Sequence, residues 1–373
     1  MGFPIRMPVT SVAVVNAYRQ FSGSTVAAKC YLASLTDCGY KTSWYQCVDS
    51  KNLSDYPSGG TIVHGLTTPF LSLNLAVNRT YYFARRLRGL NEDLILAADQ
   101  VLATLTDHHK NCLVLVHDLR EMNRATRTHL PAHLLYRYLL PKLSQAQGLL
   151  AISEASKQVI EARLKDAPPI RVVHHGTLIR GNPASHLVRS LSRLQDQKQL
   201  NVVYVAVDRP YKRIDFFLDL AREMERITPS IGVRFHFQLI SKITATTEER
   251  LRRSPIKSLN VCPEVSDMTE VWNTADILAF TSVMEGFGRP LVEAMQFGIP
   301  VIASDMEPMK EVVGDGGTLL RPLALRTWTE ALQRLTDPDR YAEAARRSSM
   351  RGAWFSPREF SQRLIRTLHY FGY

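Results

Sequence analysis

Two glutamates flank a glycine-containing turn in the C-terminal half of the chain. Glu285 directly precedes Gly286, Phe287 and Gly288, and Glu293 follows Glu285 after seven intervening residues. Glycines let the backbone approach a ligand closely, and the free N–H groups at a helix start favour an anion such as a diphosphate. Carboxylates accept hydrogen bonds and suit vicinal hydroxyls. This segment therefore predicts a site for a phosphorylated, hydroxyl-rich ligand, the alternative being a capped turn with a favourable helix-end charge.

A strand, a loop and a helix are expected to position these residues. Ile277–Phe280 is a short apolar run typical of a buried strand, and Thr281–Gly288 forms the loop after it. Pro290 suits the first turn of a helix, and the apolar residues after it continue the helical pattern. We therefore expect the turn to lie between a buried strand and the start of a helix.

The stretch EGFGRPLVEAMQFGIPVIAS resembles the donor-site signature of the retaining glycosyltransferases of family 4, which have the GT-B fold. The likeness extends over about residues 110–325, since AISEASKQVIEARL, RVVHHGTLI, NVVYVAVDRPYKRIDFFLDLA and EVVGDGGTLLRP resemble family segments in the same order. It implies that Glu285 contacts the donor sugar and that Glu293 binds the ribose. It also implies backbone contacts to sugar and phosphate from Gly286, Phe287 and Gly288, and Arg289 is counted with these donor-binding residues.

The resemblance also implies an arginine and a lysine beneath the diphosphate, from the first loop of the C-terminal half. Lys212 matches the lysine. The usual Gly-Arg is replaced by Ala206-Val207, which leaves Arg209 or Arg213, and we favour Arg209. Two cations would stabilise the charge of the departing diphosphate. The alternative is an ordinary basic turn at the surface.

In the N-terminal half, His117 and Asp118 follow an apolar run at the expected end of a strand, where open α/β sheets bind ligands. They resemble the family's His-Asp loop, which implies that His117 lies over the donor sugar and that Asp118 orients its ring. His64 is a weaker candidate. Of the family's Gly-Gly loop only Gly23 remains, where an ordinary capped helix start is an equal alternative.

The implied reaction transfers a hexose, preferably mannose or glucose, from a GDP- or UDP-sugar to a glycan or lipid-linked acceptor, with retention. No cofactor is expected besides the nucleotide-sugar substrate. No metal is expected either, because the single DxD match, Asp337-Pro338-Asp339, has the composition of a turn. Two alternatives stay open: a nucleotide-sugar epimerase of the same architecture, and a non-catalytic basic module that binds nucleic acid, although no recognisable nucleic-acid motif occurs.

Composition limits the partners and the compartment. The 373 residues carry a formal net charge of +11, which attracts phosphates, nucleic acid or an anionic membrane. Arg79, Arg85, Arg86 and Arg88 are interleaved with a group of aromatic residues and could contact such a membrane, although a solvated helix face with a buried aromatic side is the favoured interpretation. No apolar run of about eighteen residues occurs, and five cysteines suggest no disulfide framework. We expect a cytoplasmic protein. If it associates with a membrane, we expect it to do so peripherally, at the inner face.

Alternating apolar runs and helical patterns predict an α/β protein of GT-B architecture, with two Rossmann-like domains facing across a cleft. The expected domains are residues 1–185 for the acceptor and 198–352 for the donor, with 353–373 as a C-terminal helix crossing back to the first domain. Expected strands are Val12–Asn16, Thr61–His64, Leu113–His117, Gly148–Ile152, Ile170–His174, Val202–Val207, Val233–Leu239, Ile277–Phe280 and Pro300–Ala303.

Overall fold

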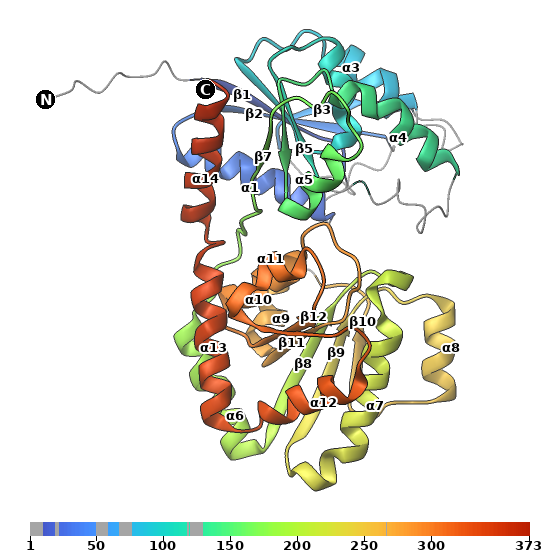
Figure 1. Ribbon diagram of the computed structural model, residues 1–373, viewed down its shortest axis with the longest axis vertical. Helices are drawn as coiled ribbons and strands as arrows, with labels where there is room; N and C mark the ends of the chain where they lie inside the picture. Colours follow the sequence, from blue (N-terminus) through green and yellow to red (C-terminus); the bar gives the residue numbers. More distant parts are fainter. Residues whose placement is uncertain are drawn as a thin grey trace, which may run out of the picture. The chain divides into compact units, whose positions relative to one another are not determined.

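Two α/β units make up the chain in the computed structural model (Figure 1). The structure describes residues 10–18, 22–49, 59–66, 77–117, 119, 130–265 and 267–373. Unit 1 comprises Met1–Gly176 and Pro357–Tyr373, and unit 2 comprises Thr177–Ser356. The division thus falls before the predicted end of the first domain at residue 185, because the helix at 183–197 packs within unit 2.

Unit 1 is built on a seven-stranded sheet in the order β3-β2-β1-β4-β5-β6-β7, in which every neighbouring pair is parallel. Its central strands are continuous apolar runs because a parallel sheet is covered on both faces. All five residues of β5, for example, are buried. The strands are β1 (Ser11–Asn16), β2 (Lys41–Val48), β3 (Thr61–His64), β4 (Leu94–Ala97), β5 (Cys112–Val116), β6 (Gly148–Ala151) and β7 (Ile170–Val172).

Helices connect the strands of unit 1, and a further helix, α14, is added to it from the end of the chain. The first begins where the Ser22 hydroxyl accepts a hydrogen bond from the Thr25 N–H group, a usual helix cap. The helices are α1 (Gly23–Asp37), the π-helix η2 (Asn78–Tyr82), α3 (Phe83–Arg86), the 3-10 helix η3 (Gln100–Asp107), α4 (Leu130–Leu143), α5 (Glu154–Glu161) and α14 (Pro357–Tyr370).

Unit 2 is built on a six-stranded parallel sheet in the order β10-β9-β8-β11-β12-β13. The order reverses direction between β8 and β11, which is the place where open α/β sheets bind ligands at their carboxyl edge. The strands are β8 (Gln199–Val205), β9 (Arg234–Ile240), β10 (Leu259–Cys262), β11 (Ile277–Phe280), β12 (Val301–Ser304) and β13 (Thr318–Leu320).

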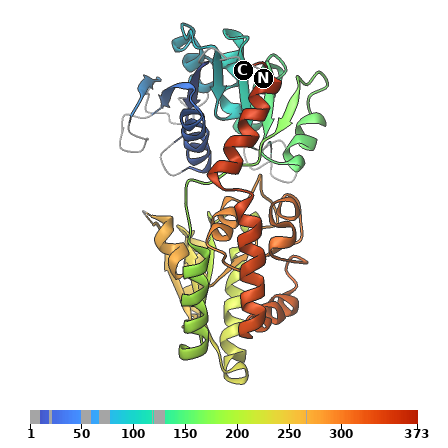
Figure 2. The same ribbon diagram turned by 90° about the vertical axis from the view of Figure 1, so that its left-hand side faces the viewer.

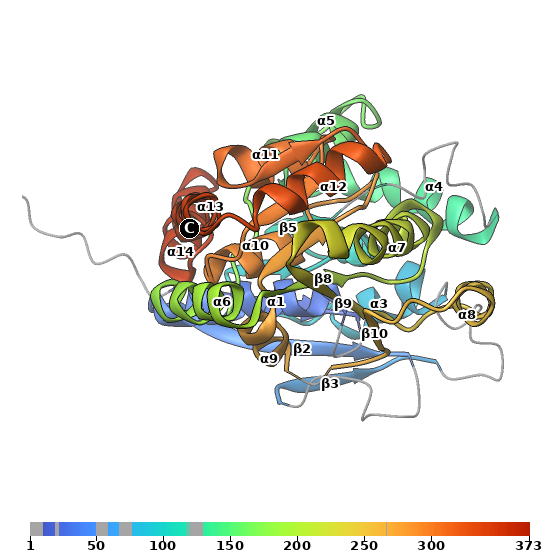
Figure 3. The same ribbon diagram turned by 90° about the horizontal axis from the view of Figure 1, so that it is seen from below.

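Helices flank the sheet of unit 2. Helix α7 packs beside α12, and α13 packs between α6 and α10 (Figures 2 and 3). No helix among the described residues is long and apolar enough to cross a membrane. The helices are α6 (Pro183–Gln197), the 3-10 helix η6 (Pro210–Lys212), α7 (Ile214–Ile231), α8 (Ala245–Arg253), α9 (Met268–Thr274), α10 (Arg289–Gln296), α11 (Met309–Val313), the 3-10 helix η7 (Gly314–Gly316), α12 (Leu325–Arg334) and α13 (Pro338–Ala353).

The nine predicted strands are all present, seven of them with ends shifted by one to three residues. The strand β12 begins at Val301 and not at the predicted Pro300, because proline has no N–H group to donate to the neighbouring strand. Of the strands in the described residues, the prediction omitted β2, β4, β10 and β13.

The final helix, α14, returns to unit 1 as predicted. Its buried residues Phe360, Leu364 and Leu368 form a helical stripe, and the Phe360 ring packs edge-on against Tyr31 of α1. Gly176 lies directly against the Phe360 side chain, and a Cβ atom at residue 176 would come within 2.6 Å of the Phe360 Cβ atom. Glycine is therefore needed at this last residue of the first part of unit 1.

Candidate active site

The loop after β11 carries the predicted turn and leads into α10. Gly288 precedes the helix with a φ of 89°, a left-handed conformation that favours glycine. A Cβ atom there would lie 2.8 Å from the Leu291 Cδ1 atom, so a larger residue would be strained. Pro290 stands in the first turn of α10, as predicted. The N–H groups of the first turn of α10 therefore follow directly after the turn at residues 285–288, which we call the glycine loop.

Hydrogen bonds hold a second loop, residues 209–213, against this one. The Val283 N–H donates to the Tyr211 carbonyl (2.9 Å), and the Thr281 hydroxyl donates to the Lys212 carbonyl (3.1 Å). The buried Tyr204 hydroxyl also donates to the Lys212 carbonyl (2.6 Å) and lies 2.8 Å from the Ser282 hydroxyl. The backbone of Lys212 is thus fixed from β8 and from the loop after β11.

This arrangement brings two predicted residues together. The Lys212 Nζ atom lies 2.5 Å from the Glu285 Oε1 atom, and the two side chains are 15% and 7% exposed. A charge-assisted hydrogen bond of this length holds both groups in place. An ammonium that can neutralise phosphate and a carboxylate that can accept from hydroxyls therefore lie side by side.

Glu293 lies on α10 and is 8% exposed. Its Oε1 atom accepts from the Arg289 guanidinium at 3.0 Å, one helical turn earlier. This ion pair fits the structural alternative, a stabilising contact within the helix. It also fits the functional interpretation, because it places a hydrogen-bond acceptor, Glu293, and a cation, Arg289, at the start of α10. The two predicted donor-site residues are thus neighbours.

The two candidate arginines differ in their contacts. The Arg213 guanidinium donates twice to the Asp215 carboxylate and holds the pKa of that carboxyl below its ordinary value. Arg209 is exposed at the start of η6, in the same loop as Lys212. Because Arg213 is engaged, Arg209 remains the predicted phosphate ligand.

In unit 1, His117 follows β5 with its ring fixed by two partners. Its Nε2 atom lies 2.9 Å from the Ala98 carbonyl oxygen, and its Nδ1 atom lies 3.3 Å from Nε2 of His175. A carbonyl can only accept, so the Nε2 atom of neutral His117 carries the proton and Nδ1 accepts from His175. The contact with Ala98 therefore sets the tautomer. Asp118, expected to orient this ring, lies outside the described residues.

Sequence reasoning missed Asp99 and His175. The buried Asp99 carboxylate lies 3.8 Å from the His117 Nε2 atom and accepts from the Ser24 hydroxyl at 3.0 Å. Burial raises the pKa of Asp99. The hydrogen bond from Ser24 connects Asp99 and the two histidines to the start of α1. Gly23, predicted as a donor-binding residue, is exposed there. His64 ends β3 with an exposed side chain.

The Asp337-Pro338-Asp339 triplet forms a helix start. The Asp337 carboxylate caps α13 by accepting from the N–H groups of Asp339 and Arg340. Among the residues that the structure describes, no three His, Cys, Asp or Glu side chains gather as a metal site. The metal independence of the reaction stays a prediction.

Part of the chain matches known proteins. Residues 199–338, which include the Lys212 and Glu285 loops, match the family model described as Glycosyl transferases group 1. The O-antigen chain mannosyltransferase B of Escherichia coli is 29% identical over 189 residues, which are 48% of this chain and 49% of that protein. A D-inositol 3-phosphate glycosyltransferase of Rhodococcus erythropolis is 27% identical over 216 residues, 55% of this chain and 49% of that protein. The chain thus spans about half the length of these curated relatives.

Solved structures share the fold over nearly the whole chain. Sucrose-phosphate synthase from Thermosynechococcus elongatus superimposes with a TM-score of 0.75 at 14% identity, covering 96% of this chain and 98% of that one. The Anabaena protein Alr3699/HepE in complex with UDP-glucose gives a TM-score of 0.71 at 16% identity, covering 96% and 99%. The two parallel-sheet units are those of the GT-B fold.

Proposed function

Because residues 199–338 belong to the Glycosyl transferases group 1 family, we propose that this chain transfers a hexose from a nucleoside-diphosphate sugar to an acceptor hydroxyl. The observation that carries the proposal is the contact between Lys212 and Glu285 beside the glycine loop of α10. At the carboxyl edge of the sheet, this contact places a cation that can neutralise phosphate, Lys212, beside a carboxylate that can accept hydrogen bonds from sugar hydroxyls, Glu285. Those are the two chemistries that a sugar diphosphate requires.

Each part of the donor has a partner on this proposal. Lys212, Arg209 and the N–H groups at the start of α10, which favour an anion, bind the diphosphate. Glu293 accepts hydrogen bonds from the ribose hydroxyls, and Glu285 accepts them from the hexose hydroxyls. A diphosphate oxygen that binds Lys212 competes with the carboxylate at 2.5 Å, so donor binding reorients Glu285 toward the sugar.

The proposed reaction retains the anomeric configuration. The bond between the anomeric carbon and the diphosphate breaks, the acceptor oxygen bonds to the same face of that carbon, and the departing phosphate oxygen takes the acceptor proton. The lysine, the arginine and the helix N–H groups stabilise the charge that develops on the leaving group, without a metal ion. The charge balance of this step needs no further reactant.

Mannose and glucose are the preferred sugars. A mannosyltransferase of O-antigen chains is among the relatives, and a structural neighbour is complexed with UDP-glucose. The proposed acceptor is a glycan or a lipid-linked glycan. We place the reaction in the cytoplasm, and at the inner face of the membrane when the acceptor is lipid-linked.

A thermal-shift panel of UDP-, GDP-, ADP- and dTDP-sugars tests the proposal first. A ligand that binds only the native state stabilises it by about 2.7 kcal/mol at a hundred times its Kd. One base is expected to raise the Tm, and the matching donor is then assayed for transfer with and without EDTA. Recovery of an epimerised nucleotide sugar in place of a transfer product would favour the epimerase, and loss of transfer in EDTA would refute metal independence.

A further inference from the structure

Unit 1 carries an exposed surface of tyrosines and arginines on η2, α3 and α4, which we name the tyrosine–arginine patch. Tyr81 and Tyr138 are 55% and 45% exposed. The Tyr138 hydroxyl lies 3.3 Å from the Thr80 carbonyl, so α4 is joined directly to η2 beside α3 (Figure 1). The patch consists of Tyr81, Tyr82, Arg85, Arg86, Arg88 and Tyr138.

The tyrosines hold the arginines of the patch in place. Arg85 donates to the Tyr81 hydroxyl (2.5 Å) and its guanidinium carbon lies 5.8 Å from the centre of that ring. Arg86 repeats this arrangement one residue later, with 3.2 Å to the Tyr82 hydroxyl and 5.3 Å to its ring. Neutral partners orient a guanidinium without cancelling its charge. The patch therefore presents ordered positive charge to solvent.

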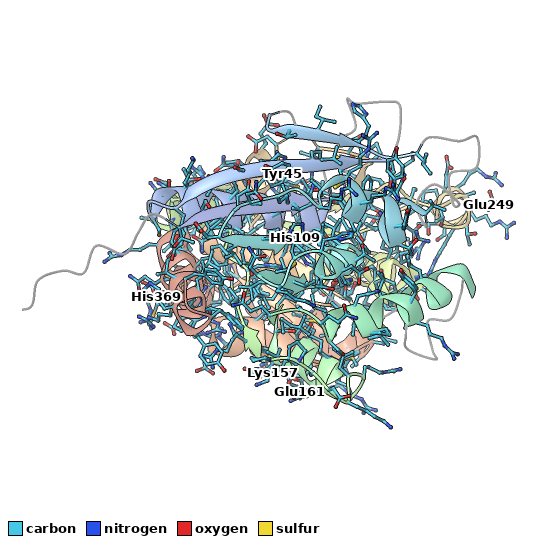
Figure 4. All side chains as sticks on the ribbon, turned by 90° about the horizontal axis from the view of Figure 1, so that it is seen from above. Tyr45, His109, Lys157, Glu161, Glu249 and His369 are labelled. Atoms are coloured by element: carbon cyan, nitrogen blue, oxygen red, sulfur yellow. The ribbon has the colours of Figure 1, made fainter. Side chains whose placement is uncertain are left out.

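Exposed arginines of unit 2 have different partners. Arg252 and Arg253 on α8 are 73% and 75% exposed, and both bind the carboxylate of Glu249, the residue of this group that Figure 4 labels. Within the described part of the chain, no carboxylate pairs with Arg85, Arg86 or Arg88. The sequence explains this contrast, because no Asp or Glu occurs between Asp55 and Glu92 or between Glu121 and Glu154.

We propose that the tyrosine–arginine patch binds the anionic surface of a phospholipid membrane. Tyrosine rings favour the headgroup region, and guanidinium groups bind lipid phosphates. Nucleic acid is the weaker fit, because bases stack on open aromatic faces and the Tyr81 and Tyr82 rings already carry a guanidinium. The inference deepens the proposed function and rests on it, because membrane binding would bring the chain to the lipid-linked acceptor proposed above.

Co-sedimentation of the full chain with lipid vesicles tests the proposal without any sugar donor. Vesicles of phosphatidylcholine containing phosphatidylglycerol are expected to bind the chain, and vesicles of phosphatidylcholine alone to bind it far less. Replacing the three arginines (R85Q, R86Q and R88Q together) is expected to lower the partition coefficient by roughly a hundredfold, at roughly fivefold for each charge. Y81A combined with Y138A is expected to lower it further through the loss of interfacial contact.

The control is R252Q combined with R253Q, which removes two exposed charges from α8, one fewer than the patch variant removes. It is expected to keep wild-type vesicle binding, because Glu249 already neutralises those arginines in part. Equal losses in both sets of variants would overturn the proposal, because general charge would then explain binding. Loss of binding to a single-stranded RNA in the patch variant, with no vesicle binding by the wild type, would assign the patch to nucleic acid. Transfer to a soluble acceptor is measured separately, so failure of the proposed function is distinguished from failure of this inference.

Discussion

Glu285 and Glu293 have different neighbours, and their replacement is expected to separate two steps. Glu293 pairs with Arg289 at the start of α10, so E293A removes the proposed ribose acceptor together with this ion pair. Nucleotide binding should weaken by about 1–3 kcal/mol, the cost of an unpaired polar partner. E285Q, which keeps the shape but loses the charge beside Lys212, should lower the transfer rate more than nucleotide affinity.

Calorimetric titration of the free nucleotide and of the nucleotide sugar measures the first effect, and turnover with the same donor measures the second. R213Q is a useful control, because Arg213 is engaged with Asp215 outside the proposed contacts. Wild-type turnover in both glutamate variants would show that the donor site lies elsewhere.

His175 is expected to position His117. Its Nε2 atom is the donor that fits the unprotonated Nδ1 atom of His117, so H175F removes the hydrogen bond that the described residues give to that nitrogen. Without this restraint, the transfer rate should fall by roughly tenfold, which corresponds to about 1.4 kcal/mol. Nucleotide affinity should hardly change, because the donor residues lie in unit 2.

Nitrogen NMR of the imidazole groups reports the hydrogen bond at His117 Nδ1, whereas the Ala98 carbonyl keeps the proton on Nε2 in every variant. H175Q retains an N–H donor and should restore both the Nδ1 signal and the rate. A glutamine variant as slow as the phenylalanine variant, with the His117 Nδ1 signal unchanged in both, would reduce His175 to a packing residue.

At the scale of elements, local patterns predicted the parts of the site and tertiary contacts assembled them. The β11–α10 unit was predictable because its apolar run, glycines and proline adjoin in sequence. The strand β2 was missed because it buries polar Gln46, whose side-chain Oε1 atom accepts from the Asn16 side-chain amide on β1 at 2.9 Å. Edge strands β10 and β13 are short and half-exposed, so their apolar patterns are weak. The partners of His117 were not predictable, since His175 lies 58 residues away.

The junction of α6 with the sheet of unit 2 predicts a pH effect on stability. His186 on α6 is buried, its Nε2 atom donates to the Ala275 carbonyl at 2.7 Å, and burial lowers its pKa. As the pH falls below about 7, the unfolded chain binds a proton before the native state does, so the free energy of unfolding decreases. For one proton the slope is at most about 1.4 kcal/mol per pH unit.

Urea unfolding between pH 7 and 5, followed by a signal from unit 2, measures this slope. H186Q retains an amide donor for the Ala275 carbonyl and should flatten the curve. An unchanged slope in H186Q would assign the acid sensitivity to other groups.

On the scale of the whole molecule, the chain passes between the units twice, after Gly176 and after Ser356. Unit 1 is therefore completed only by the last helix. Phe355 and Phe360 stand five residues apart on either side of the second passage, and both are buried. They make different contacts, because Phe355 meets Phe287 of the glycine loop and Phe360 meets Tyr31 of α1.

Truncating these two residues should affect the two units separately. F360A should destabilise unit 1 by about 3–5 kcal/mol, the usual cost of such a buried truncation, because α14 loses its contact with α1. F355A should destabilise unit 2 and weaken nucleotide binding, because it removes the packing behind Phe287. Hydrogen exchange resolved by segment measures both effects, with unit 1 read at β5 and unit 2 at β11. If both variants increase exchange equally in both strands, the units unfold as one body, and the last helix then stabilises the whole chain instead of unit 1 alone.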